Sequence, residues 1–389
     1  MPVSTSPSYE AELQTALRIV HAASHLTKRV LRSLQNNVSA ETKADDSPVT
    51  IADFAAQALI IAALHAVYPS DSFLGEESAD QLRKNDGLAE RVWELVVQAQ
   101  SRQAGDDGLG DVQAGEGGTA AGHEHDSKLT FPKSKEEMLD IIDLGTGTQT
   151  AKGRVWVMDP VDGTATFMTG NQYAVCLCLL VDGVQKVGVI GCPNLSYSFS
   201  PSSNPPTRVH EDLVDTNGYG VVLSTIHGQG AYIRTILENS LGDPQRIQHS
   251  LNTAKESKEL NFVETTMGKT SLSQAEHKDV ADVLGAKWPG TVVWSQQMKY
   301  IALTLGATDV MLRLPKDKKR YTQVWDHAGG QLLFTEVGGV IRDIDGGDID
   351  MAQGRTLTGE RNFGMVAALP GVFDTVHKAV KDVLERRTR

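Results

Sequence analysis

Residues 154–167 read RVWVMDPVDGTATF and join an apolar run to two closely spaced carboxylates and a glycine. The apolar run, Val155 to Met158, predicts a buried strand that ends at the first carboxylate. Asp159 and Asp162 then stand on either side of a Pro-Val pair. A tight turn is one explanation, since Asp-Gly pairs are common in hairpins. The other is a metal site that receives a phosphate.

The composition is ordinary for an acidic globular enzyme. Its 389 residues exceed one small core, so two packed units or one large composite domain are expected. The formal net charge of −12 disfavours nucleic-acid polymers and anionic membranes as partners, although metal ions could attract a small anion locally. Three cysteines, no apolar run near ~20 residues and no leader-like N-terminus favour a cytoplasmic protein without a membrane span.

Hydrophobic spacing predicts the main secondary-structure elements. Apolar residues recur at helical intervals over 11–34 and again over 52–69. Two β-branched runs joined through Asp182-Gly183 predict a hairpin over 171–194. Beyond the hairpin, helical and strand patterns alternate irregularly, which favours an α+β fold with mixed sheets.

Composition also predicts how the chain is divided. Residues 98–130 are rich in Gly, Asp, Glu and Ala with few large apolar side chains, so a flexible surface insertion is expected. The Pro- and Ser-rich residues 200–215 are interpreted as a connection between two halves. Residues 1–205 would form an α+β half with the metal and phosphate motifs, and 206–389 an α/β half with substrate-side residues.

Acidic residues gather at the predicted ends of strands and starts of helices. The clusters are Gly-Glu-Glu at 75–77, the motif at 159–164 and Trp-Asp-His-Ala-Gly at 325–329, with Asp53 at the start of a helix. Any one of them could be a turn or a helix terminus. Together they offer the oxygen ligands that Mg²⁺ requires. Two such ions about 3.5–4 Å apart can share a carboxylate and catalyse phosphoryl transfer.

The neutral residues of the DPVDGT motif also suit a metal and phosphate site. Pro160 stiffens the loop, and the Val161 carbonyl can act as a neutral oxygen ligand. Gly163 and Thr164 can open a helix whose free N–H groups receive a phosphate.

These motifs resemble the signatures of the Mg²⁺-dependent, lithium-sensitive phosphatases related to inositol monophosphatase. The family patterns GEE, D-P-[I/V]-D-G-T and W-D-x-A-[A/G]-G stand in order at 75–77, 159–164 and 325–330. A closer resemblance is to the 3′(2′),5′-bisphosphate nucleotidases of the fungal type, and it covers nearly the whole chain apart from the N-terminal tail and 98–130. The segments that carry it are 26–30, 47–53, 172–177, 188–195, 313–315 and 354–357.

The resemblance implies a layered α/β/α/β/α sandwich and a site with two Mg²⁺ ions. Glu76, Asp159 and the Val161 carbonyl would hold the first ion. Asp159, Asp162 and Asp326 would hold the second, and a third, weaker ion would lie near Glu76. Asp53 and Thr164 would orient and deprotonate the attacking water. These roles are those of the matching positions in the family.

The substrate-side residues follow the family less closely. Ser295, Gln296 and Lys299 stand where the nucleotidases have a substrate-facing D-S-Q-x-K-Y segment, and Lys269, Arg313 and Gly163 are further candidates for phosphate contacts. Where the nucleotidases have Lys-Gly after DGT, this chain has Ala165-Thr166.

Three functions are therefore compared. The first hypothesis is removal of the 3′-phosphate from adenosine 3′,5′-bisphosphate to give AMP, with a role in sulfur assimilation. The second is hydrolysis of an inositol phosphate or another sugar phosphate. The third is a non-catalytic nucleotide-binding paralogue, which would be expected to lack at least one metal ligand, and none is missing. The expected partner is a small phosphorylated molecule, and the chain would be a monomer or a homodimer.

Overall fold

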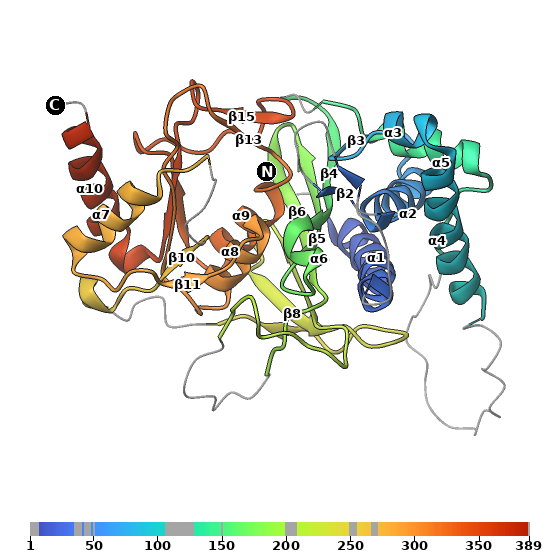
Figure 1. Cartoon of the computed structure of the whole chain (residues 1–389), viewed down its shortest axis with the longest axis horizontal. Helices are drawn as coiled ribbons and strands as arrows, with labels where there is room; N and C mark the ends of the chain where they lie inside the picture. The colour runs from blue at the N-terminus through green and yellow to red at the C-terminus, as the bar shows by residue number, and fades with distance from the viewer. Residues whose placement is uncertain are drawn as a thin grey trace, which may run out of the picture.

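Helices and sheets are stacked in alternating layers (Figure 1). The helices α1 (Glu10–Leu34) and α2 (Ile51–Val67) lie toward one end, and α7 (Gln274–Leu284) and α10 (Pro370–Arg387) at the other. The computed structural model describes the following residues: 8–34, 41–42, 48–49, 51–105, 128–148, 151–198, 208–248, 255–265 and 271–387.

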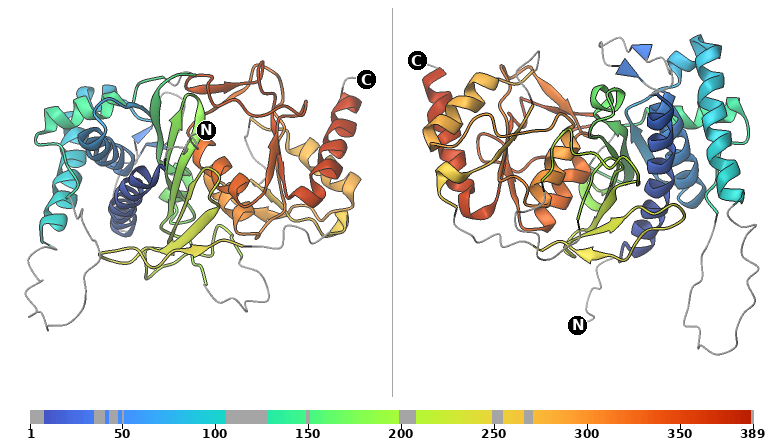
Figure 2. Two further views of the ribbon diagram at one scale, coloured as in Figure 1. Left: turned by 180° about the vertical axis from the view of Figure 1, so that it is seen from behind. Right: turned by 60° about the horizontal axis from the view of Figure 1, so that its bottom comes forward.

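The N-terminal helical layer follows from hydrophobic patterning. α1 is amphipathic, and its buried side packs on the adjacent sheet through residues such as Leu17 and Val20. α2 is apolar on all sides, because it is covered by α1, by α4 (Asp86–Gly105), by α5 (Lys135–Leu144) and by the sheet. The right-hand view of Figure 2 shows α1 and α2 side by side in this layer. Both predicted helices are confirmed.

The first sheet has 7 strands in the order β3-β4-β5-β6-β7-β8-β9. β3 and β4 are parallel, and all the other neighbours are antiparallel. The predicted hairpin is confirmed, with positive φ at both Asp182 and Gly183 between β5 and β6. The strands are β3 (Ser72–Gly75), β4 (Arg154–Asp162), β5 (Ala174–Val181), β6 (Val184–Cys192), β7 (Val221–Ile226), β8 (Ala231–Thr235) and β9 (Gln245–Arg246).

The second sheet has 5 strands in the order β11-β10-β12-β16-β14. Two helices, α8 (Gln296–Thr304) and α9 (Ala328–Glu336), share one apolar core with both sheets. α7 and α10 cover the outer face of the second sheet. Its strands are β10 (Phe262–Glu264), β11 (Thr291–Val292), β12 (Val310–Arg313), β14 (Val340–Arg342) and β16 (Met365–Ala368).

The remaining elements are short and connect the layers. No helix in the described ranges combines the length and the apolar composition needed to cross a membrane. The short elements are α3 (Asp80–Lys84), α6 (Thr164–Met168), the 3-10 helix η2 (Ser257–Glu259), β1 (Glu41–Thr42), β2 (Pro48–Val49), β13 (Tyr321–Gln323) and β15 (Thr356–Thr358).

The order of layers is the α/β/α/β/α sandwich that the resemblance implies, so the predicted fold is confirmed. The predicted insertion begins too early, because residues 98–105 are the last part of α4. Their Ala, Gln and Arg side chains favour a helix although few of them are apolar. Residues 106–127 lie outside the described residues.

The first sheet continues to Arg246, so it extends beyond residue 205, where the N-terminal half of the chain was expected to end.

A bulge in β4 gives the DPVDGT motif its shape. Asp159 pairs with Cys176 and Asp162 with Ala174, so β4 carries one residue more than β5 between these pairs. Side chains three apart on a regular strand point to opposite faces, and the extra residue turns both carboxylates to the same side. Pro160 fits such a bulge because it has no N–H to donate.

Gly163 closes this bend in a left-handed conformation, with φ of 97°. A Cβ atom at this position would lie 2.9 Å from Ser295 Cβ and 2.8 Å from Thr166 Oγ1. The position therefore requires glycine both for its backbone angle and for the close approach of two neighbours.

We predict that Gly163→Ala lowers the free energy of unfolding by about 2–5 kcal/mol, the sum of left-handed strain and overpacking. Gly170→Ala is the matched control, because Gly170 has φ of 79° but nothing within 4 Å of a Cβ. This control should lose only about 1–2 kcal/mol. Urea unfolding measures both losses, and equal losses would contradict the packing at Gly163.

Candidate active site

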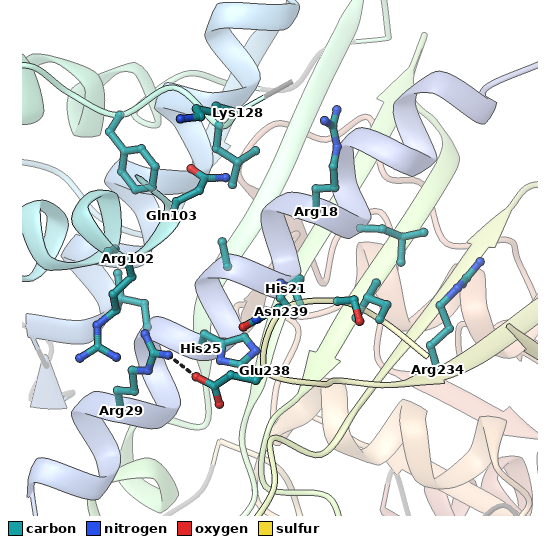
Figure 3. Close-up of a pocket in the computed structure, with 18 of the residues that line it drawn as sticks. Arg18, His21, His25, Arg29, Arg102, Gln103, Lys128, Arg234, Glu238 and Asn239 are labelled. Atoms are coloured by element: carbon teal, nitrogen blue, oxygen red, sulfur yellow. Dashed lines mark hydrogen bonds and ion pairs between the residues drawn. The ribbon is translucent and has the colours of Figure 1, made fainter. Parts of the chain in front are cut away.

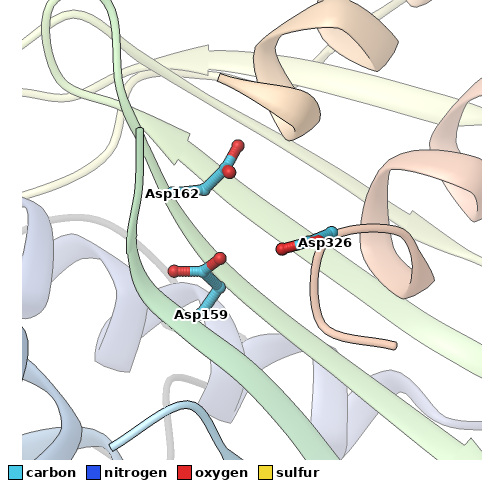
Figure 4. A group of neighbouring side chains, drawn as sticks. All are labelled: Asp159, Asp162 and Asp326. Atoms are coloured by element: carbon cyan, nitrogen blue, oxygen red, sulfur yellow. The ribbon is translucent and has the colours of Figure 1, made fainter. Parts of the chain in front are cut away.

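Three carboxylates meet at the junction of the two halves of the sandwich. One carboxylate oxygen from each of Asp159, Asp162 and Asp326 lies within 4.8 Å of the others. Figure 4 shows the first two on β4 and the third on the loop that leads into α9. The structure thus brings together acids that are far apart in the sequence.

A cavity of about 230 Å³ opens over these carboxylates. Its lining joins acidic side chains to the backbone and small side chains at the start of α6, with one large aromatic side chain at the edge. The lining residues are Glu76, Asp159, Val161, Asp162, Gly163, Thr164, Ala165, Thr166, Trp294 and Asp326. The cavity therefore combines oxygen ligands with space for a small group.

Burial and mutual repulsion disfavour the ionised form of these carboxylates. The pKa of Asp159 is raised well above its ordinary value, first by burial and then by the charges of Glu76 and Asp162. Burial, followed by the charge of Asp162, raises the pKa of Asp326 to about 7. Like charges this close in a buried site favour the protonated form unless a cation is added.

The donor set fits a hard divalent cation. One oxygen of Asp159 is buried and has no hydrogen-bond partner among the described residues. Such an oxygen would lose its solvation without compensation unless a ligand restored it. Carboxylate and carbonyl oxygens are the ligands that Mg²⁺ and Ca²⁺ prefer. The cluster can therefore hold a metal ion.

Asp162 is oriented by the N-terminus of α8. Its carboxylate accepts hydrogen bonds from the Ser295 hydroxyl and from the backbone N–H groups of Gln296, at 3.3 Å, and Gln297, at 2.5 Å. Ser295 is also the N-cap of α8, since its oxygen accepts from the Met298 N–H at 3.1 Å. These contacts lower the pKa of Asp162 and partly offset the rise caused by its burial.

Asp326 is oriented by a buried chain of hydrogen bonds. The Thr322 hydroxyl donates to Asp326 at 3.1 Å and lies 2.9 Å from Nε2 of His327. Nδ1 of His327 lies 2.8 Å from the Tyr300 hydroxyl. Burial lowers the pKa of His327 well below its ordinary value, so the ring is neutral. Because the Thr322 proton goes to Asp326, His327 donates from Nε2 and accepts from Tyr300.

The Gly-Glu-Glu turn is held by two residues for which no role was predicted. The Gln57 side chain accepts from the Glu77 N–H at 3.0 Å and donates to the Glu77 carbonyl at 2.8 Å. Arg355 donates to the Gly75 carbonyl at 2.6 Å. Arg355 belongs to the segment 354–357 that carries part of the resemblance, which was the only signal for it.

The predicted catalytic pair lies beside the cluster. Asp53 is fully buried in the first turn of α2, and its charge contributes to the raised pKa of Asp159. The Thr164 hydroxyl begins α6, lines the cavity and donates to the Val161 carbonyl at 3.3 Å. Glu76, predicted as a metal ligand, lines the same cavity. Their roles stay predictions.

Of the predicted substrate-side residues, Gly163 and Thr164 line the cavity, whereas the side chains contributed by α8 and β12 do not. The side-chain oxygen Oε1 of Gln296 accepts from Arg313 at 2.5 Å, and Arg313 also donates to the Thr322 hydroxyl at 3.1 Å. Lys299 is buried, and burial lowers its pKa to about 8. Neither these side chains nor Ser295 is among the residues that line the cavity. Lys269 lies outside the described residues.

The two departures from the nucleotidase pattern have different surroundings. Ala165 is exposed and lines the cavity, so the missing lysine would have stood at its edge. Thr166 is buried, and its hydroxyl lies within hydrogen-bond distance of the carbonyls of Gly163, at 2.8 Å, and Gln172, at 2.7 Å. Of the two departures, therefore, only the one at Ala165 removes a charged side chain that could contact a substrate.

Trp294 is a cavity residue that the sequence reading missed. Its side chain is 42% exposed, which is unusual for a tryptophan, and it lines the cavity next to the carboxylates. Its backbone N–H donates to Glu211 at 2.5 Å, so the position of the main chain is fixed independently of the ring. Nothing in the spacing of the sequence marks this residue, because it lies on a short connection between β11 and α8.

Comparisons with known proteins agree with this architecture. The model of the inositol monophosphatase family matches residues 9–95 and 125–378. A 3′(2′),5′-bisphosphate nucleotidase of Schizosaccharomyces pombe is 36% identical over 382 residues, which cover 97% of each chain. The protein of the same name from Emericella nidulans is 38% identical over 383 residues, covering 97% of this chain and 99% of that one.

Solved structures share the fold at much lower identity. An IMPase of Thermotoga maritima superposes with a TM-score of 0.55 at 16% identity, covering 97% of this chain and 99% of that chain. At this identity the likeness bears on the fold alone. The family match extends over most of the chain, and relatives at 36% and 38% identity span nearly all of it, so this chain belongs to the inositol monophosphatase family.

Proposed function

We propose that this chain is a magnesium-dependent phosphomonoesterase that removes the 3′-phosphate of adenosine 3′,5′-bisphosphate and releases AMP. The observation that carries this proposal is the set of three carboxylates, within 4.8 Å of one another, in a cavity large enough for a phosphate. The names of the full-length relatives support the same reaction. Hydrolysis of an inositol phosphate is the second candidate, because Ala165 leaves the cavity without the cation expected of a nucleotidase.

Each side chain of the site has a task in such a reaction. Asp159, Asp162 and Asp326, together with Glu76 and the Val161 carbonyl, would hold two Mg²⁺ ions, with a third, weaker one near Glu76. When bound, these ions would lower the pKa of the attacking water and neutralise charge on the phosphate. Thr164, assisted by Asp53, would orient that water and take its proton. The N–H groups at the start of α6 would receive the phosphate oxygens.

Several finer expectations accompany this function. We expect inhibition by lithium, a cytoplasmic location and a role in sulfur assimilation, all of which derive from the resemblance. Ser295, Gln296, Lys299 and Arg313 would act on the substrate indirectly, by placing Asp162 and by adding positive charge below the cavity.

Trp294 favours a nucleotide over an inositol phosphate. A large exposed aromatic ring at the edge of the cavity offers a flat face for a base. Stacking of a base on an aromatic side chain contributes about 1–3 kcal/mol. An inositol ring has no aromatic face to stack, so this contact would distinguish the two substrate classes.

Phosphate release tests the proposed function. With Mg²⁺, we expect adenosine 3′,5′-bisphosphate and its 5′-phosphosulfate analogue to be hydrolysed faster than inositol 1,4-bisphosphate or inositol monophosphate. Asp159→Ala should abolish turnover, because this carboxylate would contact both ions. A faster rate with either inositol phosphate would favour the second candidate. Undiminished turnover by the variant would refute catalysis at these carboxylates.

We predict that Mg²⁺ binds about tenfold more weakly at pH 6 than at pH 8, because a cation must displace the proton from Asp326. The pKa of Asp326 is raised to about 7, so the carboxyl is mostly protonated at pH 6 and mostly ionised at pH 8. Isothermal titration calorimetry at the two pH values measures the difference. In Asp326→Asn the affinity should be lower and its pH dependence smaller. Equal wild-type affinities at pH 6 and pH 8 would contradict the electrostatics of the cluster.

We predict that Trp294→Ala raises KM for the adenine nucleotide about fivefold or more and leaves KM for inositol monophosphate unchanged, because only the base stacks. Trp294→Phe is the matched control and should retain most of the affinity. The backbone contact to Glu211 is preserved in both variants. Steady-state kinetics with both substrates measures the effect. A similar rise in KM for both would show that the ring has only a structural role.

A further inference from the structure

A second and larger cavity lies away from the carboxylates. It has a volume of about 1340 Å³ and opens between α1, the C-terminal part of α4, the segment 128–131 and the segment 234–244 (Figure 3). None of the residues that line it also lines the cavity over Asp159. It is therefore a separate cavity in the N-terminal half, and the reaction proposed above does not involve it.

The walls of this cavity are basic, although the chain as a whole carries a formal charge of −12. Its acidic lining residues are Glu238 and Asp243, and Glu238 is paired with an arginine at 2.7 Å. The basic lining residues are Arg18, Arg29, Arg102, Lys128 and Arg234. Figure 3 shows these five side chains spread around the cavity rather than gathered on one edge. Such a concentration of positive charge in an acidic protein attracts anions.

A buried, neutral histidine forms part of the cavity wall. His25 lines the cavity and is only 6% exposed. Its Nε2 lies 2.8 Å from the Leu237 carbonyl, and its Nδ1 has no hydrogen-bond partner in the described part of the chain. Burial, followed by the charge of His21, lowers the pKa of His25 to about 4, so the ring is neutral. Because Nε2 must carry the proton, Nδ1 is an acceptor that lacks a donor.

Rings and apolar side chains complete the lining. The His25 ring lies 3.9 Å from the Tyr219 ring and 4.5 Å from the His21 ring, measured between centroids. Leu17 and Phe131 are buried side chains of the same lining. A ligand that matches these walls needs an organic body as well as negative charge.

We propose that this cavity binds a nucleoside polyphosphate, at a site separate from the active site. Guanidinium groups bind phosphate oxygens through paired, charge-assisted hydrogen bonds. The base and ribose supply a planar organic body for the rings and apolar side chains of the lining. Ligand pockets commonly span about 300–1000 Å³, so the volume leaves room for a molecule of this size. Binding here does not depend on the function proposed for the carboxylates.

Titration calorimetry of the full-length protein with ATP tests the proposal. EDTA is included so that metal-dependent binding at the carboxylates cannot contribute. We expect saturable binding at one site, which Asp159→Ala leaves unchanged. Absence of binding by the wild type, or its loss in Asp159→Ala, would overturn the proposal.

Charge reversal locates the site. Arg102→Glu should weaken ATP binding at least about tenfold, because it replaces an attraction to phosphate with a repulsion. Arg386→Glu is the matched control and should bind as the wild type does, since Arg386 is exposed and near the C-terminal end of α10, as Arg102 is in α4. Equal affinities of the two variants would refute the assignment of this cavity.

Two fragments of the ligand test its chemical class. Adenosine and tripolyphosphate should each bind at least about tenfold more weakly than ATP, because each lacks one half of the contacts. Tripolyphosphate that binds as tightly as ATP would show that the organic body contributes nothing. Adenosine that binds as tightly would show that the basic walls do not recognise phosphate. Either result would overturn the proposed ligand class.

Discussion

Repulsion between buried carboxylates is the constraint around which the centre of this molecule is arranged. Carboxylate oxygens of Asp159, Asp162 and Asp326 lie within 4.8 Å of one another, with Asp159 and Asp162 buried and Asp326 partly buried. Such a cluster is unfavourable unless it is protonated, hydrogen-bonded or joined by a cation. The fold supplies hydrogen bonds to two of the three: the N-terminus of α8 donates to Asp162, and Thr322 donates to Asp326. One buried oxygen of Asp159 has no hydrogen-bond partner among the described residues, so it is the oxygen best placed to bind a cation.

The layered architecture explains how these residues meet. The bulge in β4 turns two carboxylates to one side, and α8 and α9, packed between the sheets, bring Ser295 and Asp326 to them from the other half. The hydrogen-bonded chain from Tyr300 through His327 to Thr322 lies in the interior and links Asp326 to the core. Polar groups in such a buried network hold one another in a single orientation. The site is therefore rigid because it is part of the packing between the sheets.

Local patterns in the sequence were sufficient for the α+β class and for locating the three acidic motifs that the fold brings to one cavity. The helical spacing in α1 and α2, the Asp182-Gly183 turn and the three acidic motifs each depend on neighbours in the chain. The end of α4 was missed because its Ala, Gln and Arg residues suit both a solvated helix and a loop. Gln57, Arg355 and Trp294 were missed because their importance depends on contacts between segments that are distant in sequence. Gln296 was expected to face the substrate, whereas its side chain accepts a hydrogen bond from Arg313 and does not line the cavity.

We propose that the three carboxylates, together with Glu76 and the Val161 carbonyl, hold two cations that share Asp159 and receive a phosphate between them. A crystal structure of the protein grown with Mn²⁺ and inorganic phosphate tests it most directly, because the anomalous signal locates each ion. We predict two peaks about 3.5–4 Å apart, both in contact with Asp159, with the phosphate oriented toward the start of α6. A single peak, or ions that avoid Asp159, would contradict the shared-carboxylate arrangement.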